Sequence, residues 1–392
     1  MPFDPERLAR LDRHFATYVD DGRLAGWQLA LTLHDEVAHT ASYGHRDREA
    51  GLPVPDDTVW RIASMTKPIA SVCAMTLWEE GLFDLNDPVS RWIPSFADMT
   101  VYEGGGLDDY TTVPAADQIR VWQLLSHSAG LTAGFMNSNV VDALYRNLGQ
   151  DPTLTLDESI DAFAALPLLF QPGKRWGYGI STDVLGRLIE IWSGKSLDEA
   201  IYERVTGPLG MHDTTWSAQE NQVDRLAALY APDPATLKAV RFDAMAGLAL
   251  RRPLALSAGG GLLSTVADYL RFTRMLARGG ELDGARILNP RTIALMTRNH
   301  LPAGLSELST GGFSETAFDG MGFGLGFAVL LDPTRGRTTS SAGEYTWGGA
   351  CSTVFWVDPA EELTAVFMTQ LLPSTTHPIR PQLRQLVYSA LL

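Results

Sequence analysis

The segment that most constrains the fold of this 392-residue chain is residues 64–80, where apolar side chains occupy nearly every face of a helix that Gly81 ends. A helix that is apolar all round is usually buried on all sides. Pro68 is tolerated there because an N–H group in the first turn of a helix has no intrahelical acceptor, so no hydrogen bond is lost when proline lacks it. We therefore predict a central helix at residues 64–80 with other elements packed around it.

The two ends of the chain carry strand patterns that could surround such a helix. Leucines alternate with Ala30 and Thr32 over residues 29–33, a tight turn follows at 34–36, and residues 37–44 are a second extended run, which together predict a hairpin. The same criteria predict strands at 322–331, 345–359 and 362–370, a turn at 358–362, and amphipathic helices at 4–21 and 378–392. These patterns favour an α/β protein of the α+β type, in which both chain ends build an antiparallel sheet flanked by terminal helices.

The region between these ends has a different composition. Residues 82–255 are rich in proline, glycine and aspartate and contain several short helical fragments. We predict that they form a mostly helical inserted region with long surface loops. Residues 1–81 and 256–392 are then expected to form one α/β domain, with the active site in the cleft between the two parts.

Composition argues against several classes of partner. The chain has 31 basic and 46 acidic residues, a net charge of −15, and an acidic surface repels phosphate backbones and anionic lipid headgroups. We therefore expect neither a nucleic-acid partner nor a membrane partner. Cys73 and Cys351 cannot form a disulfide framework and lie in no metal-binding pattern, so no metal and no cofactor are expected.

The N-terminal residues 1–26 are charged and amphipathic, unlike the apolar stretch of about seven to fifteen residues in a secretory signal. No apolar run approaches the roughly eighteen residues that span a bilayer. A cytoplasmic protein is the resulting expectation. The oligomeric state cannot be read from these patterns.

Ser64 and Lys67 form an S-x-x-K pair at the start of the predicted central helix. A spacing of three puts both side chains on one helical face, where they can touch. A serine hydroxyl is a weak nucleophile until a base takes its proton, and a lysine amine can do so when burial favours its neutral form. Chance remains an alternative for the motif alone, but a lysine is costly to bury in an apolar helix without a purpose. We predict Ser64 as a nucleophile and Lys67 as its base.

Two glycine-rich segments carry further candidates. Residues 172–183 form a loop that opens onto a helix and places Tyr178 at the helix mouth, where its phenol can face a cleft. Residues 345–350 place Gly348 and Gly349 at the entry to a strand, where missing side chains let a ligand approach the backbone closely. Both features have a structural alternative to a role in a site. Tyr178 could simply pack in the core, and the two glycines could form a bulge or a tight bend.

Taken together, Ser64-x-x-Lys67, Tyr178 and the segment 347–349 resemble the three motifs of the serine β-lactamase and penicillin-binding protein superfamily. The resemblance is closest to class C β-lactamases and to the β-lactamase-like carboxylesterases of family VIII. It spans nearly the whole chain. Residues 124–131 and 259–265 support it, because they are also similar to segments of that superfamily.

The resemblance implies a β-lactamase-like fold and a set of roles. Ser64 is expected to attack a carbonyl carbon, and Lys67 and Tyr178 to share the general-base and general-acid work. The backbone N–H groups of Ser64 and Ala350 are expected to bind the oxyanion. His127, within the 124–131 segment, is implied to be structural.

Two departures from the β-lactamase motifs bear on the substrate. Ile180 stands where β-lactamases have an asparagine that orients the substrate amide, and Trp347 stands where they have a cation for the substrate carboxylate. Tryptophan supplies apolar surface instead, and the Trp347-Gly348-Gly349 pattern resembles family VIII esterases. We predict a serine hydrolase that cleaves small neutral carboxylic esters, with Trp347, Gly348 and Gly349 in contact with substrate.

Three other functions remain open at this stage. The first is a β-lactamase or D-alanyl-D-alanine peptidase, and the second is an acyltransferase that uses the same acyl-enzyme. The third is a binding module on an inactive enzyme fold, which the intact Ser64, Lys67 and Tyr178 oppose. The G-x-S-x-G elbow of α/β-hydrolases is absent from the sequence.

Overall fold

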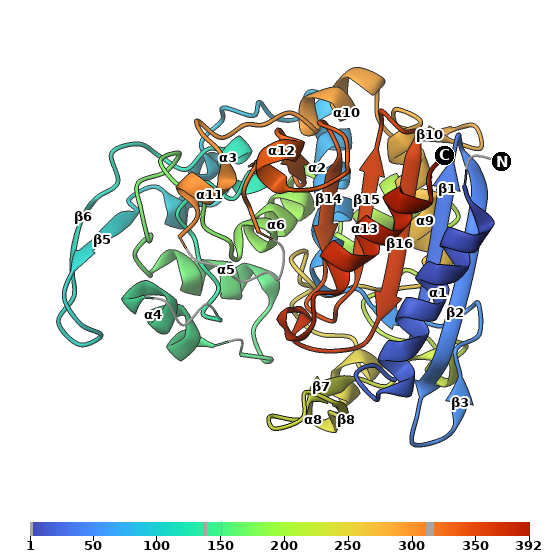
Figure 1. Ribbon diagram of the computed structural model, residues 1–392. Helices are drawn as coiled ribbons and strands as arrows, with labels where there is room; N and C mark the ends of the chain where they lie inside the picture. Colours follow the sequence, from blue (N-terminus) through green and yellow to red (C-terminus); the bar gives the residue numbers. More distant parts are fainter. Residues whose placement is uncertain (1–2, 136–138, 150, 311–316) are drawn as a thin grey trace.

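A computed structural model describes residues 3–135, 139–149, 151–310 and 317–392. Its centre is an eight-stranded antiparallel sheet in the order β12-β13-β14-β15-β16-β1-β2-β3 (Figure 1). The strands are β1 (Gly26–Leu33), β2 (Glu36–Asp47), β3 (Leu52–Pro53), β12 (Met321–Phe323), β13 (Ala328–Leu330), β14 (Tyr345–Gly348), β15 (Val354–Asp358) and β16 (Leu363–Thr369). β1 pairs with β16 from Trp27 opposite Thr369 to Leu33 opposite Leu363. Both chain ends therefore build one sheet, as predicted.

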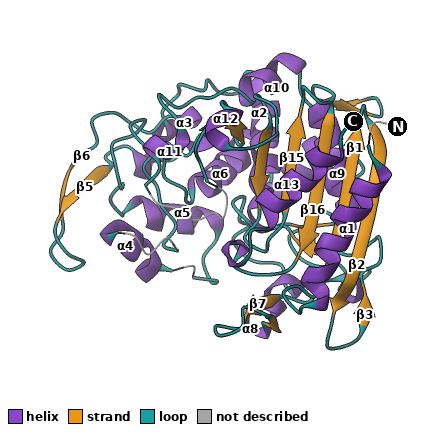
Figure 2. Ribbon diagram, viewed as in Figure 1, coloured by secondary structure: helices purple, strands orange, loops and turns teal. Residues whose placement is uncertain are grey.

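Helices cover both faces of this sheet. α1 (Pro5–Asp20) and α13 (Ile379–Ala390) pack together over one face, and both lie in front of the strands in Figure 2. α9 (Val266–Ala277) packs on β1, β15 and β16. Leu29 and Leu31 join the apolar cluster of α1 and α13, whereas Ala30 joins the cluster of α9, since successive strand residues point to opposite faces. All of β1 is buried as a result.

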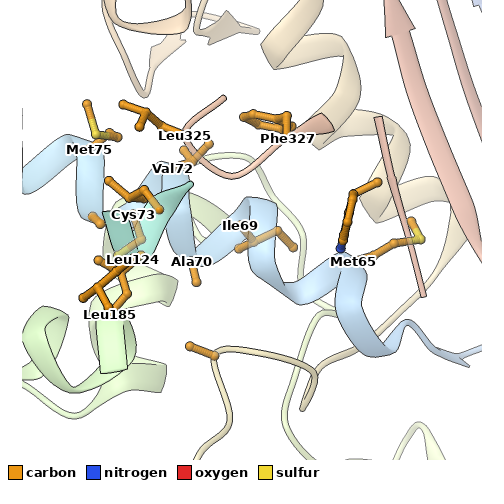
Figure 3. Packing of buried hydrophobic residues seen from close by; sticks show 14 of the residues in the cluster. Met65, Ile69, Ala70, Val72, Cys73, Met75, Leu124, Leu185, Leu325 and Phe327 are labelled. Atoms are coloured by element: carbon orange, nitrogen blue, oxygen red, sulfur yellow. The ribbon is translucent and has the colours of Figure 1, made fainter. Parts of the chain in front are cut away.

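The predicted central helix is α2 (Thr66–Glu79), preceded by a 3-10 turn over Ala63–Met65. Every side chain of α2 from Thr66 to Leu77 is buried. Figure 3 shows apolar side chains of α2 together with Leu124, Leu185, Leu325 and Phe327 from other elements. The prediction of a helix buried on all sides is confirmed.

In the sequence, most of the remaining elements lie between β3 and β12. The helices are α3 (Val121–Leu125), α4 (Val140–Leu148), α5 (Leu156–Ala164), α6 (Ser181–Ser193), α7 (Leu197–Ile201), α8 (Asp243–Ala246), α10 (Pro290–Met296), α11 (Leu305–Leu308) and, after β13, α12 (Pro333–Gly336). Short strand pairs are β4 (Trp60–Arg61) with β9 (Leu263–Ser264), β5 (Thr100–Gly104) with β6 (Thr111–Pro114), β7 (Tyr230–Pro232) with β8 (Ala239–Arg241), and β10 (Glu281–Leu282) with β11 (Ala285–Arg286). None of the helices in the described parts of the chain combines the length and apolarity that crossing a bilayer requires.

The predicted helical region 82–255 therefore also contains two hairpins, β5–β6 and β7–β8. The sequence does not reveal these hairpins, because most side chains of β6 and β8 are exposed or half-buried. Strands without a buried face have no alternation of apolar and polar residues to reveal them.

Two strand predictions were wrong in their extent. Residues 322–331 do not form one strand but the hairpin β12–β13, because Gly326 has φ +101° and reverses the chain. Residues 345–359 likewise divide into β14 and β15, which pair antiparallel from Tyr345 opposite Val357 to Gly348 opposite Val354. Gly348 thus ends a strand, and Gly349 lies in the turn that follows it instead of at a strand entry.

Candidate active site

Ser64 and Lys67 meet at the start of α2. Lys67 Nζ lies 3.5 Å from Ser64 Oγ. Lys67 itself is buried, with only 5% of its surface exposed. The residue before the serine, Ala63, has φ +45°, a left-handed conformation that is uncommon for a residue with a side chain. The local fold therefore sets a serine hydroxyl beside a buried amine, as the S-x-x-K spacing predicts.

The amine of Lys67 has a second partner, which is a backbone carbonyl. Lys67 Nζ donates to Gly259 O at 2.5 Å. Gly259 belongs to the loop that leads into β9, and this loop is fastened to α2 because the Leu262 N–H donates to Thr66 Oγ1 at 3.1 Å. This acceptor could not be predicted from the sequence, since every residue type carries a backbone carbonyl.

Tyr178 reaches the same place from the loop before α6. The centroid of its ring lies 4.6 Å from Lys67 Nζ, and the residue is buried. The loop packs closely on residues 127–132, because a Cβ at Gly179 would lie 2.5 Å from Thr132 Cα. Only glycine fits at that position. The structure thus brings Ser64, Lys67 and Tyr178 together from two segments of the chain.

His127 packs behind the tyrosine ring. Its ring centroid is 5.0 Å from that of Tyr178 and 5.5 Å from that of Phe323. Its backbone carbonyl accepts the Gly177 N–H at 2.9 Å. Burial, and secondarily the charge of nearby Lys67, lower the pKa of His127 well below its usual value. These contacts agree with a structural histidine that holds the tyrosine loop.

Aromatic side chains form one wall of the site. The ring of Trp347 on β14 lies 5.4 Å from that of Tyr178 and 5.2 Å from that of Phe323. Trp176 stacks on Tyr178 with ring centroids 5.9 Å apart and planes at 19°. Ile180, the other departure noted in the sequence, is buried in the apolar core. We call Trp176, Phe323 and Trp347 the aromatic wall.

The turn after β14 lies directly against the segment that leads into Ser64. A Cβ at Gly349 would lie 2.2 Å from Ile62 O, and Thr353 Oγ1 donates to the same carbonyl at 3.3 Å. The turn that carries Ala350 therefore lies beside the segment 62–64, where an oxyanion site made of the N–H groups of Ser64 and Ala350 would have to lie.

Arg380 of α13 lies next to Gly348 and Gly349, although no motif in the sequence singles it out. A Cβ at Gly348 would lie 2.4 Å from Arg380 Cζ, and Arg380 Nη2 donates to Gly349 O at 2.8 Å and to Thr353 O at 3.1 Å. Since neighbours in a strand face opposite ways, Arg380 lies on the side of β14 away from the Trp347 ring. A cation is thus present beside this strand, but it binds the carbonyls of the turn at residues 349–353, which we call the glycine turn, on the side of β14 away from Trp347.

A cavity of about 480 Å³ adjoins the site across β14. Its walls include Trp347 and Gly348, the apolar side chains of Phe318 and Met321, and Arg380. Ser64, Lys67 and Tyr178 are not among its lining residues. The cavity is therefore lined by two of the predicted substrate-contact residues, Trp347 and Gly348, but by none of the three predicted catalytic residues.

The chain is similar to known proteins along nearly its whole length. The family model described as Beta-lactamase matches residues 11–389. Protein Rv1367c of Mycobacterium tuberculosis is 36% identical over 362 residues, which cover 90% of this chain and 88% of that protein. Esterase EstB of Burkholderia gladioli is 31% identical over 405 residues, 97% of this chain and 95% of EstB. The solved structure of EstCE1, described as a hydrolase with promiscuous acyltransferase activity, matches with a TM-score of 0.82 and 28% identity over 98% of this chain and 99% of its own.

Proposed function

The chain belongs to the beta-lactamase family, and we propose that it is a carboxylesterase that cleaves small neutral carboxylic esters through an acyl-enzyme on Ser64. One observation carries the proposal: Lys67 Nζ lies 3.5 Å from Ser64 Oγ in a site that also holds the ring of Tyr178. A nucleophile within reach of a base, with a third group beside the base, is the arrangement that covalent acyl transfer needs.

In the first half of the proposed reaction, Ser64 Oγ bonds to the carbonyl carbon of the ester while its proton passes to the pair Lys67 and Tyr178. The bond to the alcohol oxygen then breaks, and the same pair returns the proton to the departing alcohol. In the second half water attacks the acyl-enzyme and releases the acid. Because two coupled groups titrate as a pair, the proton is assigned to the pair as a unit.

The negative charge that develops on the carbonyl oxygen is proposed to fall between the N–H groups of Ser64 and Ala350. Removing one such donor typically costs about 100- to 1000-fold in rate. The glycine turn that carries Ala350 is held by Ile62 on one side and by Arg380 on the other. This support favours a donor that is fixed before the substrate arrives.

The preference for neutral esters rests on the aromatic wall. Trp176 and Trp347 pack on the ring of Tyr178, and Phe323 packs on both tryptophans, whereas the guanidinium of Arg380 lies behind β14. An uncharged acyl or alcohol group gains by burial against such rings. The similarity to an esterase over 97% of this chain supports the same substrate class.

The experiment is a panel of short-acyl and long-acyl p-nitrophenyl esters measured beside a chromogenic cephalosporin. We expect kcat/KM for the best short ester to exceed that for the cephalosporin by at least about 100-fold, a gap of about 2.7 kcal/mol in transition-state binding. A cephalosporin hydrolysed as efficiently as the best ester would put the β-lactamase function first.

The covalent step is tested on the protein itself. Intact-mass and peptide measurements after mixing with a slow ester should show one acyl group on the peptide that contains Ser64. Ser64→Ala should abolish turnover with the fold intact, and Ser181→Ala is the matched control. Acylation at Ser126, Ser128 or Ser181 would overturn the assignment.

Acyl transfer is a second candidate, because EstCE1 is described as a hydrolase with promiscuous acyltransferase activity. Both reactions share the acyl-enzyme and differ only in whether water or another nucleophile attacks it. Adding an alcohol to the ester assay and measuring the new ester against free acid gives the partition directly. Predominant transfer at modest alcohol concentration would make acyltransferase the better description.

A further inference from the structure

The carboxylate of Asp183 has no role in the proposed reaction, but it binds Gly259, the residue whose carbonyl accepts the hydrogen bond from Lys67. Asp183 Oδ1 accepts the Gly259 N–H at 3.0 Å and the Ser257 hydroxyl at 2.7 Å. The carbonyl of the same Gly259 accepts from Lys67 Nζ at 2.5 Å. Residue 259 is thus held by a carboxylate at its N–H while its carbonyl binds the amine.

The close approach depends on the absence of a side chain at residue 259. A Cβ there would lie 2.6 Å from Asp183 Oδ2, which is closer than carbon and oxygen tolerate. Gly259 is itself buried. Glycine at residue 259 therefore leaves the room in which the Asp183 carboxylate lies against the loop.

Asp183 also belongs to the segment that carries the tyrosine. It lies in the first turn of α6, five positions after Tyr178. Through Gly259 it connects this segment to the amine of Lys67, which comes from α2. The carboxylate of Asp183 is thus one link between the two members of the proton-transfer pair.

We propose that Asp183 is a positioning residue for Lys67, an inference that rests on the proposed function. Lysine carries its amine on a flexible four-carbon stem, so a fixed acceptor is needed to keep Nζ directed at Ser64 Oγ. Asp183 fixes that acceptor and touches no reacting atom. A displacement of about 1 Å at a reacting group can cost about 100-fold in rate.

The test compares Asp183→Ala and Asp183→Asn with matched changes at Asp268, which occupies the corresponding position in the first turn of α9. Asp183→Ala should lower kcat about 30- to 100-fold and leave KM within about threefold. Asp183→Asn should stay within about fivefold of wild type, because an amide oxygen can accept the same two hydrogen bonds. Asp268→Ala should keep kcat within about threefold of wild type.

A structural role is separated from positioning by the pH profile. The acid limb of kcat/KM reports the essential base of the free enzyme, so it should move in Asp183→Ala and stay in place in Asp268→Ala. If Asp183→Ala does not fold, Asp183→Ser keeps a polar helix start but is too short to reach Gly259, and it has to show the same loss. Equal losses in Asp183→Ala and Asp183→Asn with an unmoved acid limb would overturn the proposal.

Failure of this inference is distinguishable from failure of the proposed function. A fluorophosphonate that does not label wild-type Ser64 would remove the esterase mechanism and the inference with it. Wild-type labelling and ester turnover, combined with unchanged kcat in Asp183→Ala, would overturn the positioning role alone.

Discussion

Adding one methyl group at Gly349 is expected to displace the oxyanion site without touching Ser64 or Lys67. The Cβ of an alanine at this position would lie 2.2 Å from Ile62 O and 2.3 Å from Thr353 Oγ1, whereas ordinary contact for a Cβ is 3.4–4 Å. Ile62 and Thr353 are both fully buried, and the Ile62 oxygen belongs to the main chain, so neither atom can easily move aside. The turn after β14 therefore has to move by about 1 Å away from the segment that leads into Ser64.

The size of the effect follows from that displacement. Misplacing a reacting group by about 1 Å costs about 100-fold, and losing one oxyanion donor costs about 100- to 1000-fold. We expect Gly349→Ala to lower kcat for a p-nitrophenyl ester about 100- to 1000-fold, or about 2.7 to 4 kcal/mol. Overpacking also destabilises a fold by about 1–3 kcal/mol. Calorimetry and near-UV circular dichroism on the same samples give the folded fraction, so that kcat can be stated per folded enzyme.

The matched control is Gly247→Ala. A Cβ at Gly247 would have no heavy atom within 4 Å, so both kcat and stability should match wild type. A Gly349→Ala enzyme that is folded and keeps kcat within about threefold of wild type would refute the placement of the oxyanion at this turn.

Three further predictions test the proton transfer, the histidine and a buried carboxylate. Lys67→Met and Tyr178→Phe should each lower kcat by at least about 1000-fold, and the double variant should lose less than the sum because both act in one unit; additive losses would show independent roles. His127→Asn should keep kcat within about tenfold, since Asn also tolerates the φ of +56° at this position, and a drop of about 1000-fold would assign chemistry to the ring. Burial raises the pKa of Asp268 to about 6, so the stability that its protonation contributes is present below about pH 4 and is lost as the pH rises through about 6. Asp268→Asn should therefore raise the free energy of unfolding by about 2 kcal/mol at pH 7 and by little at pH 4 in urea titrations, whereas equal stability at pH 7 would contradict the raised pKa.

The elements that the sequence predicted well are those whose side chains follow a clear period. The central helix, the N-terminal hairpin and both terminal helices agree with the structure because a buried face imposes its spacing on the residues. Residues 322–331 and 345–359 were each predicted as one strand. Aromatic and β-branched residues on both sides of the glycines have the same strand pattern, and only the fold shows that the chain reverses between β12 and β13 and between β14 and β15.

The candidate site divides in the same way between sequence and tertiary structure. The sequence by itself determined that Ser64 and Lys67 share a helical face, because a spacing of three within one helix is local geometry. Only the tertiary structure decided that the ring of Tyr178 lies beside that amine, that the carbonyl of Gly259, 192 residues further along the chain, accepts from it, and that Arg380 lies behind the glycine turn. Such contacts join segments that approach each other only when the sheet and its helices pack, and several of them use backbone carbonyls, which every residue type carries alike.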